Sequence, residues 1–201
     1  MISSIEFDYK KATQALNYLA RQERSKKINK MKALKLIWAA DRYHLRKYAR
    51  PVTGDRYMAM QYGPVASSVK DIAEKSDFLS EEEKNYSGRY IKPMDRYTLL
   101  SVREPDLAVF SQTDLEAINF AKNCFGSMNQ FDLSEATHQY PEWAKFASRF
   151  KTNAATREPM SFKDFFDDPS VVSDPFKMDP KLLRDSKEIF HEQAELASLW
   201  F

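Results

Sequence analysis

The chain has 201 residues, of which 43% are hydrophobic and 30% charged, and its formal net charge at pH 7 is +2. These values are typical of a soluble globular protein with one good core, and they exclude an intrinsically disordered chain. No apolar run is long enough to span a membrane, and the N-terminus lacks the apolar core of a signal peptide. We therefore expect a cytoplasmic protein that makes no membrane contact, in which the single Cys124 is a small core residue.

The two parts of the chain differ in charge. Residues 1–75 hold 16 Lys and Arg against 7 Asp and Glu, whereas residues 76–201 hold 15 against 22. The densest basic run consists of Lys26, Lys27, Lys30, Lys32 and Lys35. Such a run fits a solvated helix face, a docking site for an acidic protein surface, or a contact with a nucleic-acid backbone.

The first predicted helix begins after Asp8, whose side chain is a suitable N-cap, and it ends near residue 25. A second helix follows and carries an apolar face at spacings of three and four residues. That face consists of Met31, Leu34, Ile37, Trp38, Leu45 and Tyr48.

Asp41 lies on this apolar face, between Trp38 and Leu45. Burying a carboxylate there is costly unless it is hydrogen-bonded or paired. We expect backbone N–H groups of a following turn to bind it, with Arg42 and His44 beside it. This structural interpretation is favoured over a catalytic or ligand-binding role.

Turn chemistry follows the second helix. Pro51 ends the helix, and Thr53-Gly54-Asp55 is typical of a turn. Residues 57–62 are predicted to form a short strand, with Tyr57, Ala59 and Gln61 on one face and Met58, Met60 and Tyr62 on the other. Gly63-Pro64 ends this strand, and Pro64 is predicted to occupy the first position of a third helix.

Residues 80–88 are polar and are predicted to form a loop, and strands are predicted at 89–92 and 97–103. Two capping-box patterns then predict helix starts, Ser111 with Asp114 and Asp132 with Glu135.

The last quarter of the chain differs in composition. Residues 151–180 combine several Pro and Asp residues with Phe162, Phe165, Phe166 and Phe176. Acidic segments of this kind dock along a groove, either on their own domain or on a partner. A final helix is predicted from Pro180, and its apolar face must pack on its own domain or on a partner chain, identical or not.

These elements predict an α+β fold that is predominantly α-helical, with helices flanking a small antiparallel sheet. We expect a domain at residues 1–155 and an acidic, aromatic C-terminal extension with a terminal helix at residues 156–201.

The sequence offers little catalytic chemistry. Only four glycines are present, so no glycine-rich phosphate loop is expected. The histidines His44, His138 and His191 are far apart, and no Cys-x-x-Cys occurs. We expect a protein that is not an enzyme and that needs no metal or cofactor, with His138 ending a helix beside an aromatic cluster.

The block from Trp38 to Val65 reads W-A-A-D-R-Y-H-L-x-x-Y-x-R-P-x-T-G-D-x-Y-x-A-M-x-Y-G-P-V, and residues 133–138 read L-S-E-A-T-H, followed by Pro141, Glu142 and Trp143. Both stretches resemble the Panacea domain, the SocA-like antitoxin domain that also occurs in phage-associated proteins. The resemblance covers about residues 7–150. Ala49 departs from it, because the family usually has Gly there.

The resemblance implies an antitoxin that binds and neutralises a cognate protein toxin. A proteolytic adaptor that delivers a toxin to a protease, and a nucleic-acid-binding regulator, are the alternatives, and nucleic acid is the less favoured partner. A homodimer is also possible. The motif residues expected to maintain the fold are Asp41, Arg42, His44, Arg50, Pro51, Gly54, Asp55, Tyr57, Tyr62, Gly63, Pro64, His138 and Trp143. The residues expected to contact a partner are Lys26, Lys27, Lys30, Lys32, Tyr43, Tyr57, Phe190, Trp200 and Phe201, with Tyr43 and Tyr57 as exposed aromatics.

Overall fold

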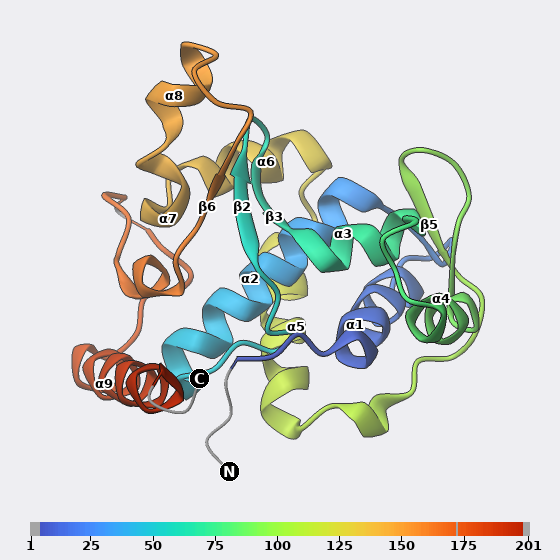
Figure 1. The fold of residues 1–201 in the computed structure, drawn as a ribbon, viewed down its shortest axis with the longest axis horizontal. Helices are drawn as coiled ribbons and strands as arrows, with labels where there is room; N and C mark the ends of the chain where they lie inside the picture. The colour runs from blue at the N-terminus through green and yellow to red at the C-terminus, as the bar shows by residue number, and fades with distance from the viewer. Residues whose placement is uncertain (1–4, 172, 199–201) are drawn as a thin grey trace.

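The computed structural model describes residues 5–171 and 173–198. Within them, nine α-helices and two short 3-10 helices surround two three-stranded antiparallel sheets (Figure 1). The predicted α+β, mainly helical class is confirmed. The strands form two separate sheets, whereas the sequence predicted one small sheet. None of the described helices is long and apolar enough to cross a membrane.

The helices are α1 (Tyr9–Arg21), α2 (Lys30–Tyr48), α3 (Ser67–Glu74), α4 (Glu81–Gly88), α5 (Gln112–Phe125), α6 (Gln130–His138), α7 (Pro141–Ala144), α8 (Ala147–Lys151) and α9 (Pro180–Ser198), with the 3-10 helices η1 (Leu107–Val109) and η2 (Phe162–Phe166). Sheet A has the order β1 (Lys27–Asn29), β5 (Thr98–Ser101), β4 (Ile91–Pro93). Sheet B has the order β3 (Gly63–Ala66), β2 (Tyr57–Met60), β6 (Arg157–Pro159).

Helix α2 passes through the centre of the molecule, and α1, α5, α6, α9 and η2 all contact it (Figure 1). The predicted apolar face is buried at Ile37, Trp38 and Leu45, but Leu36 and Ala39 are buried as well. The helix is thus enclosed on more sides than its periodicity predicted, because elements from both ends of the chain pack around it.

Local side-chain chemistry explains most helix starts. Asp8 accepts hydrogen bonds from two N–H groups of the first turn of α1, and the Ser111–Asp114 capping box opens α5, so both predictions are confirmed. The capping box predicted at Asp132 is wrong, because the N-cap of α6 is Asn129.

Two further predictions are corrected by the structure. Pro64 does not open a helix; it lies in β3, which pairs with β2 across a tight turn, and α3 begins only at Ser67. Residues 81–88 form α4 rather than a loop, opened by a capping box between Ser80 and Glu83. Only Ser87 of α4 is buried, so the helix carries no apolar periodicity that a sequence pattern could show.

The acidic, aromatic segment docks on the rest of the same chain. Strand β6 pairs with β2, and Phe165, Phe166 and Phe176 are buried in the core. Helix α9 packs against α2 and η2 through Phe190 and Ser186, whose hydroxyl donates to the main-chain oxygen of a residue in α2. Trp200 and Phe201 lie outside the described residues.

Candidate protein-interaction site

The carboxylate of Asp41 holds the turn that follows α2. Asp41 is fully buried, and its Oδ1 accepts hydrogen bonds from the main-chain N–H groups of Val52 (2.8 Å) and Thr53 (3.0 Å). Its Oδ2 accepts from the hydroxyls of Thr53 (2.6 Å) and Tyr57 (2.8 Å). Burial raises the pKa of Asp41 to about 6 and these hydrogen bonds oppose that shift, so the carboxylate is ionised at neutral pH. The predicted hydrogen bonding of Asp41 to a turn is confirmed.

The same turn is anchored to its surroundings at Gly54 and Asp55. Gly54 has φ +68°, and a Cβ there would lie 2.2 Å from the main-chain oxygen of Glu6, so only glycine fits. The carboxylate of Asp55 accepts from the N–H groups of Ser68 (3.1 Å) and Val69 (2.8 Å), which open α3. The turn therefore connects α2, α3 and the N-terminal segment.

Arg42 and Arg46 lie one turn apart on α2, and both are fully buried. Arg42 pairs with Glu142 (Nη1–Oε2, 2.6 Å) and donates to the main-chain oxygen of Asp167 (2.7 Å). Arg46 donates to the main-chain oxygen of Phe166 (2.7 Å). The two guanidinium groups thus hold α7 and the segment around η2 against the central helix. Arg46 was not among the predicted site residues, although its four-residue spacing from Arg42 on a buried helix was a usable signal.

His44 completes this set on the opposite side of α2. Its Nδ1 lies 2.6 Å from the main-chain oxygen of Arg50, and its Nε2 lies 3.0 Å from Thr113 Oγ1. Burial lowers the pKa of His44 to about 4, so the imidazole is neutral at pH 7. The buried carboxylate of Asp114 lies 3.4 Å from His44 Nε2 and pairs with Lys11 (2.8 Å) and Arg50 (3.0 Å). Each ring nitrogen of His44 has a partner inside the fold.

The turn between β2 and β3 is bound to α2 and α6. The main-chain oxygen of Tyr62 accepts from Ser134 Oγ (2.7 Å) and from Lys35 Nζ. Gly63 has φ +100°, and a Cβ there would lie 2.4 Å from Thr137 Oγ1. Glycine is therefore required where the hairpin meets α6. Burial lowers the pKa of Lys35 to about 7.

The second motif stretch binds the same hairpin. The rings of His138 and Trp143 stack with centroids 3.7 Å apart, and Trp143 Nε1 donates to the main-chain oxygen of Met60 (2.8 Å). Burial lowers the pKa of His138. The two motif stretches, residues 38–65 and 133–143, thus meet around β2 and β3.

This arrangement gives the buried polar motif residues structural partners within the fold. The buried carboxylates, guanidinium groups and imidazole bind turns and helix ends. Among the described residues, no group of three His, Cys, Asp or Glu side chains is placed to hold a metal ion.

Of the aromatic residues predicted to contact a partner, the three in the described part of the chain make contacts within the fold. Tyr57 was expected to be exposed, which is wrong: it is 3% exposed, because its hydroxyl binds the buried Asp41. Tyr43 is half-buried and stacks on Phe120, with ring centroids 4.1 Å apart. Phe190 is 5% exposed and packs in the core, so it presents no accessible surface.

The lysines of the predicted basic run differ in their surroundings: some bind within the fold and others are exposed. Lys30 is buried, and its Nζ donates to the main-chain oxygen of Asp95 at 2.8 Å. Lys32 Nζ donates to the main-chain oxygen of Gly126, the residue after α5, at 2.6 Å. Lys26 and Lys27 are exposed. Of this predicted set, only these last two side chains remain accessible to a partner.

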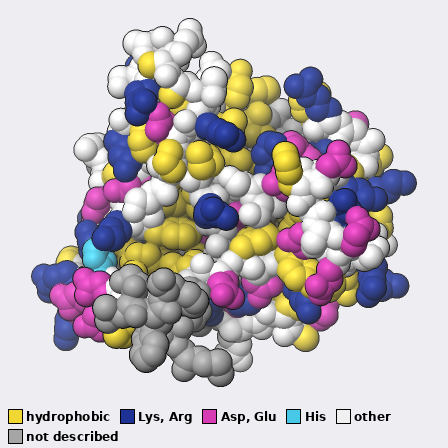
Figure 2. Space-filling view, in the orientation of Figure 1, with side chains coloured by type: hydrophobic (Ala, Val, Ile, Leu, Met, Phe, Trp, Pro, Cys, Tyr) yellow, Lys and Arg dark blue, Asp and Glu magenta, His cyan; other side chains and the backbone are white. Residues whose placement is uncertain are grey.

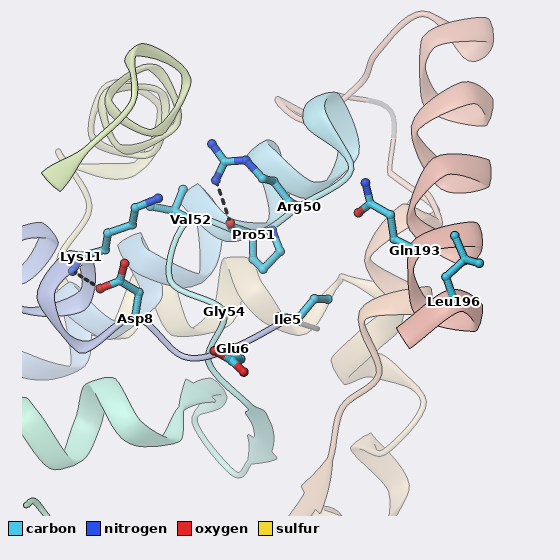
Figure 3. Close-up of a pocket in the computed structure, with 10 residues that line it drawn as sticks. All are labelled: Ile5, Glu6, Asp8, Lys11, Arg50, Pro51, Val52, Gly54, Gln193 and Leu196. Atoms are coloured by element: carbon cyan, nitrogen blue, oxygen red, sulfur yellow. Dashed lines mark hydrogen bonds between the residues drawn. The ribbon is translucent and has the colours of Figure 1, made fainter. Parts of the chain in front are cut away.

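A cleft of about 470 Å³ lies between the motif turn and α9. Figure 3 shows Arg50 and Pro51 on one wall, and Gln193 and Leu196 of α9 facing them across it. Arg50 is bound to Asp114, so its guanidinium already has an acidic partner at this cleft.

The outer face of sheet B is an apolar surface. The strand register places Met58, Val65 and Pro159 in one row across the three strands. Tyr62 at the adjoining turn is exposed, as is Phe131 on α6, one turn before the serine that binds the Tyr62 main chain. Figure 2 shows hydrophobic side chains gathered over this sheet and α6.

Comparison with protein-family models matches residues 34–144 to the family described as antitoxin SocA-like, Panacea domain. The comparisons with curated proteins and with solved structures gave no match. The matched range begins within α2 and contains both motif stretches and the turns they hold, and it covers more than half of the chain. The chain therefore belongs to the SocA-like antitoxin family with a Panacea domain.

Proposed function

We propose that this protein is an antitoxin that neutralises a cognate protein toxin by binding it directly, without catalysis. The family match over residues 34–144 is the observation that carries this proposal. The structure supports direct binding in one respect: the polar motif side chains are already bound within the fold, so they serve to shape the domain. Recognition of a toxin then falls to the exposed surfaces that the motif holds in place.

The test begins with the reading frame next to this gene. That frame is expressed alone and together with this protein, and growth is recorded in each case. We expect the neighbouring product to arrest growth alone, and co-expression to restore growth and yield a complex that survives purification. Unrestored growth, or restored growth without a complex, would contradict the proposal.

The level of the toxin separates direct neutralisation from delivery to a protease. Direct neutralisation leaves the amount of toxin unchanged, as measured by immunoblot after co-expression. A fall in toxin level that disappears in protease-deficient cells would assign the adaptor role instead.

A further inference from the structure

Sheet A has one buried face and one exposed face. The register aligns Ile28 with Leu99, and both are buried against the core. It also aligns Lys27, Leu100 and Lys92 in a row across the three strands. Because neighbouring residues of a strand point to opposite faces, this second row points away from the core. Lys27 and Lys92 are exposed on either side of a half-buried leucine.

Further cations surround this row, which we call the sheet A face. The exposed cations on its strands and on the segments that flank them are Arg24, Lys26, Lys27, Arg89, Lys92, Arg96 and Arg103. None of these seven forms an ion pair within the described part of the chain, whereas Lys11 and Arg21 on α1, Lys32 on α2 and Lys122 on α5 do. Figure 2 shows Lys and Arg side chains projecting from the edge of the molecule where Figure 1 places β5, with Asp and Glu side chains beside them.

The acidic side chains next to the sheet A face already have partners. Glu23 pairs with Lys122 at 2.5 Å, and Glu104 pairs with Arg21. The carboxylate of Asp95 accepts two main-chain N–H groups of its own turn, both at 2.7 Å. In the described structure, none of these carboxylates forms an ion pair with a cation of the sheet A face, and an external acidic surface would complement those cations.

Apolar side chains accompany these cations. Met94, Tyr97 and Val102 are 48%, 62% and 46% exposed at the two ends of the sheet. Exposed aromatic and methionine side chains next to cations are typical of protein interfaces. A single-stranded nucleic acid would need rings on the sheet on which bases stack, but the central row carries Leu100 between two lysines. An acidic protein surface fits this composition better.

We propose that the sheet A face is the docking surface for the toxin, and that the toxin presents an acidic patch to it. This inference rests on the proposed function, because it specifies where and by what chemistry that partner binds. The cations of the sheet A face steer association with the toxin, and its apolar side chains provide the contact area.

The test reverses two charges on the sheet A face. Lys27→Glu with Lys92→Glu changes only exposed side chains, so the strand hydrogen bonds remain. Lys177→Glu with Lys181→Glu is the matched control, because it makes the same change in net charge at two exposed lysines near α9 that form no ion pair in the described chain. Melting temperatures of both proteins show that the fold is kept, and Lys27→Ala with Lys92→Ala replaces the first variant if it does not fold.

The probe is the purified product of the neighbouring reading frame, and its association rate with each protein is measured at about 50 and about 200 mM NaCl. At the lower salt we expect the sheet A variant to associate at least about tenfold more slowly than the unaltered protein, and the control less than about twofold. The difference should shrink at the higher salt, since screening weakens steering.

Three outcomes would overturn the inference while leaving the proposed function intact: an unchanged rate in the sheet A variant, equal slowing in both variants, or a salt-independent difference. A labelled single-stranded 24-mer oligonucleotide, about 24 nucleotides being enough for one or more such sites, is titrated in parallel. Oligonucleotide binding that the sheet A variant alone loses, with toxin binding unchanged, would assign this face to nucleic acid. If the unaltered protein does not bind the neighbouring product, the proposed function fails, and this inference fails with it.

Discussion

Replacing Asp41 with alanine removes the acceptor of four hydrogen bonds at once. The donors are the N–H groups of Val52 and Thr53 and the hydroxyls of Thr53 and Tyr57, and Asp41 itself is fully buried. A small apolar side chain cannot accept from any of them. The turn after α2 would then contain donors with neither a protein partner nor free access to water.

The expected loss follows from these contacts. A buried donor left without an acceptor lowers the free energy of unfolding by about 1–3 kcal/mol, so four such donors should lower it by at least about 4 kcal/mol. The free energy of unfolding of a small protein is about 5–15 kcal/mol, so the variant should be close to unfolding at room temperature. Asp41→Asn should cost less, about 1–2 kcal/mol, because its amide oxygen can still accept from the two main-chain N–H groups.

Urea denaturation followed by circular dichroism measures both variants. Asp77→Ala is the control, because Asp77 is exposed and forms no hydrogen bond through its side chain in the described structure. The expected order of stability is unaltered protein and control, then Asp41→Asn, then Asp41→Ala. An Asp41→Ala midpoint equal to that of the control would refute the conclusion that this carboxylate holds the turn.

Four further changes can be measured in the same way. Ala49→Gly should raise the free energy of unfolding by about 1 kcal/mol, because Ala49 ends α2 with φ +56°; a less stable variant would contradict this. Gly63→Ala should lower the free energy of unfolding by about 1–3 kcal/mol, because Gly63 has φ +100° and its Cβ would meet the hydroxyl of Thr137. Gly88→Ala is the control and should leave the free energy of unfolding unchanged, because a Cβ there meets open space. Because burial lowers the pKa of His44 from 6.5 to about 4, the native state resists protonation, and stability should fall by about 3 kcal/mol as pH drops from 6.5 to 4; an equally steep fall in His44→Gln would exclude this residue as the cause. Phe190→Ala should cost about 3–5 kcal/mol, and an unchanged melting curve would show that α9 does not stabilise the domain.

Local sequence chemistry was sufficient for several elements of this fold. The caps at Asp8 and Ser111 and the apolar stripe of α2 all depend on residues within one or two turns of each other. The unusual position of Asp41 on that stripe also predicted a hydrogen-bonded turn, because a buried carboxylate must find donors nearby. The resemblance of the two motif stretches indicated the family that the comparison of residues 34–144 then showed.

The tertiary structure decided what depends on residues far apart in the chain. Pro64 fits the start of a helix or an edge strand equally well, and only its pairing with β2 selects the strand. Tyr57 was predicted to be an exposed aromatic residue, but in the folded chain its hydroxyl donates to the buried Asp41.

The same holds for the partners of the central helix and for the sheet A face. Arg42 meets Glu142 across 100 positions of sequence, and the row formed by Lys27, Leu100 and Lys92 comes from three separate strands. Periodicity and capping report only on neighbours within a few residues. The choice of long-range partners depends on how all the apolar faces pack together, and this packing also determines which charges remain exposed.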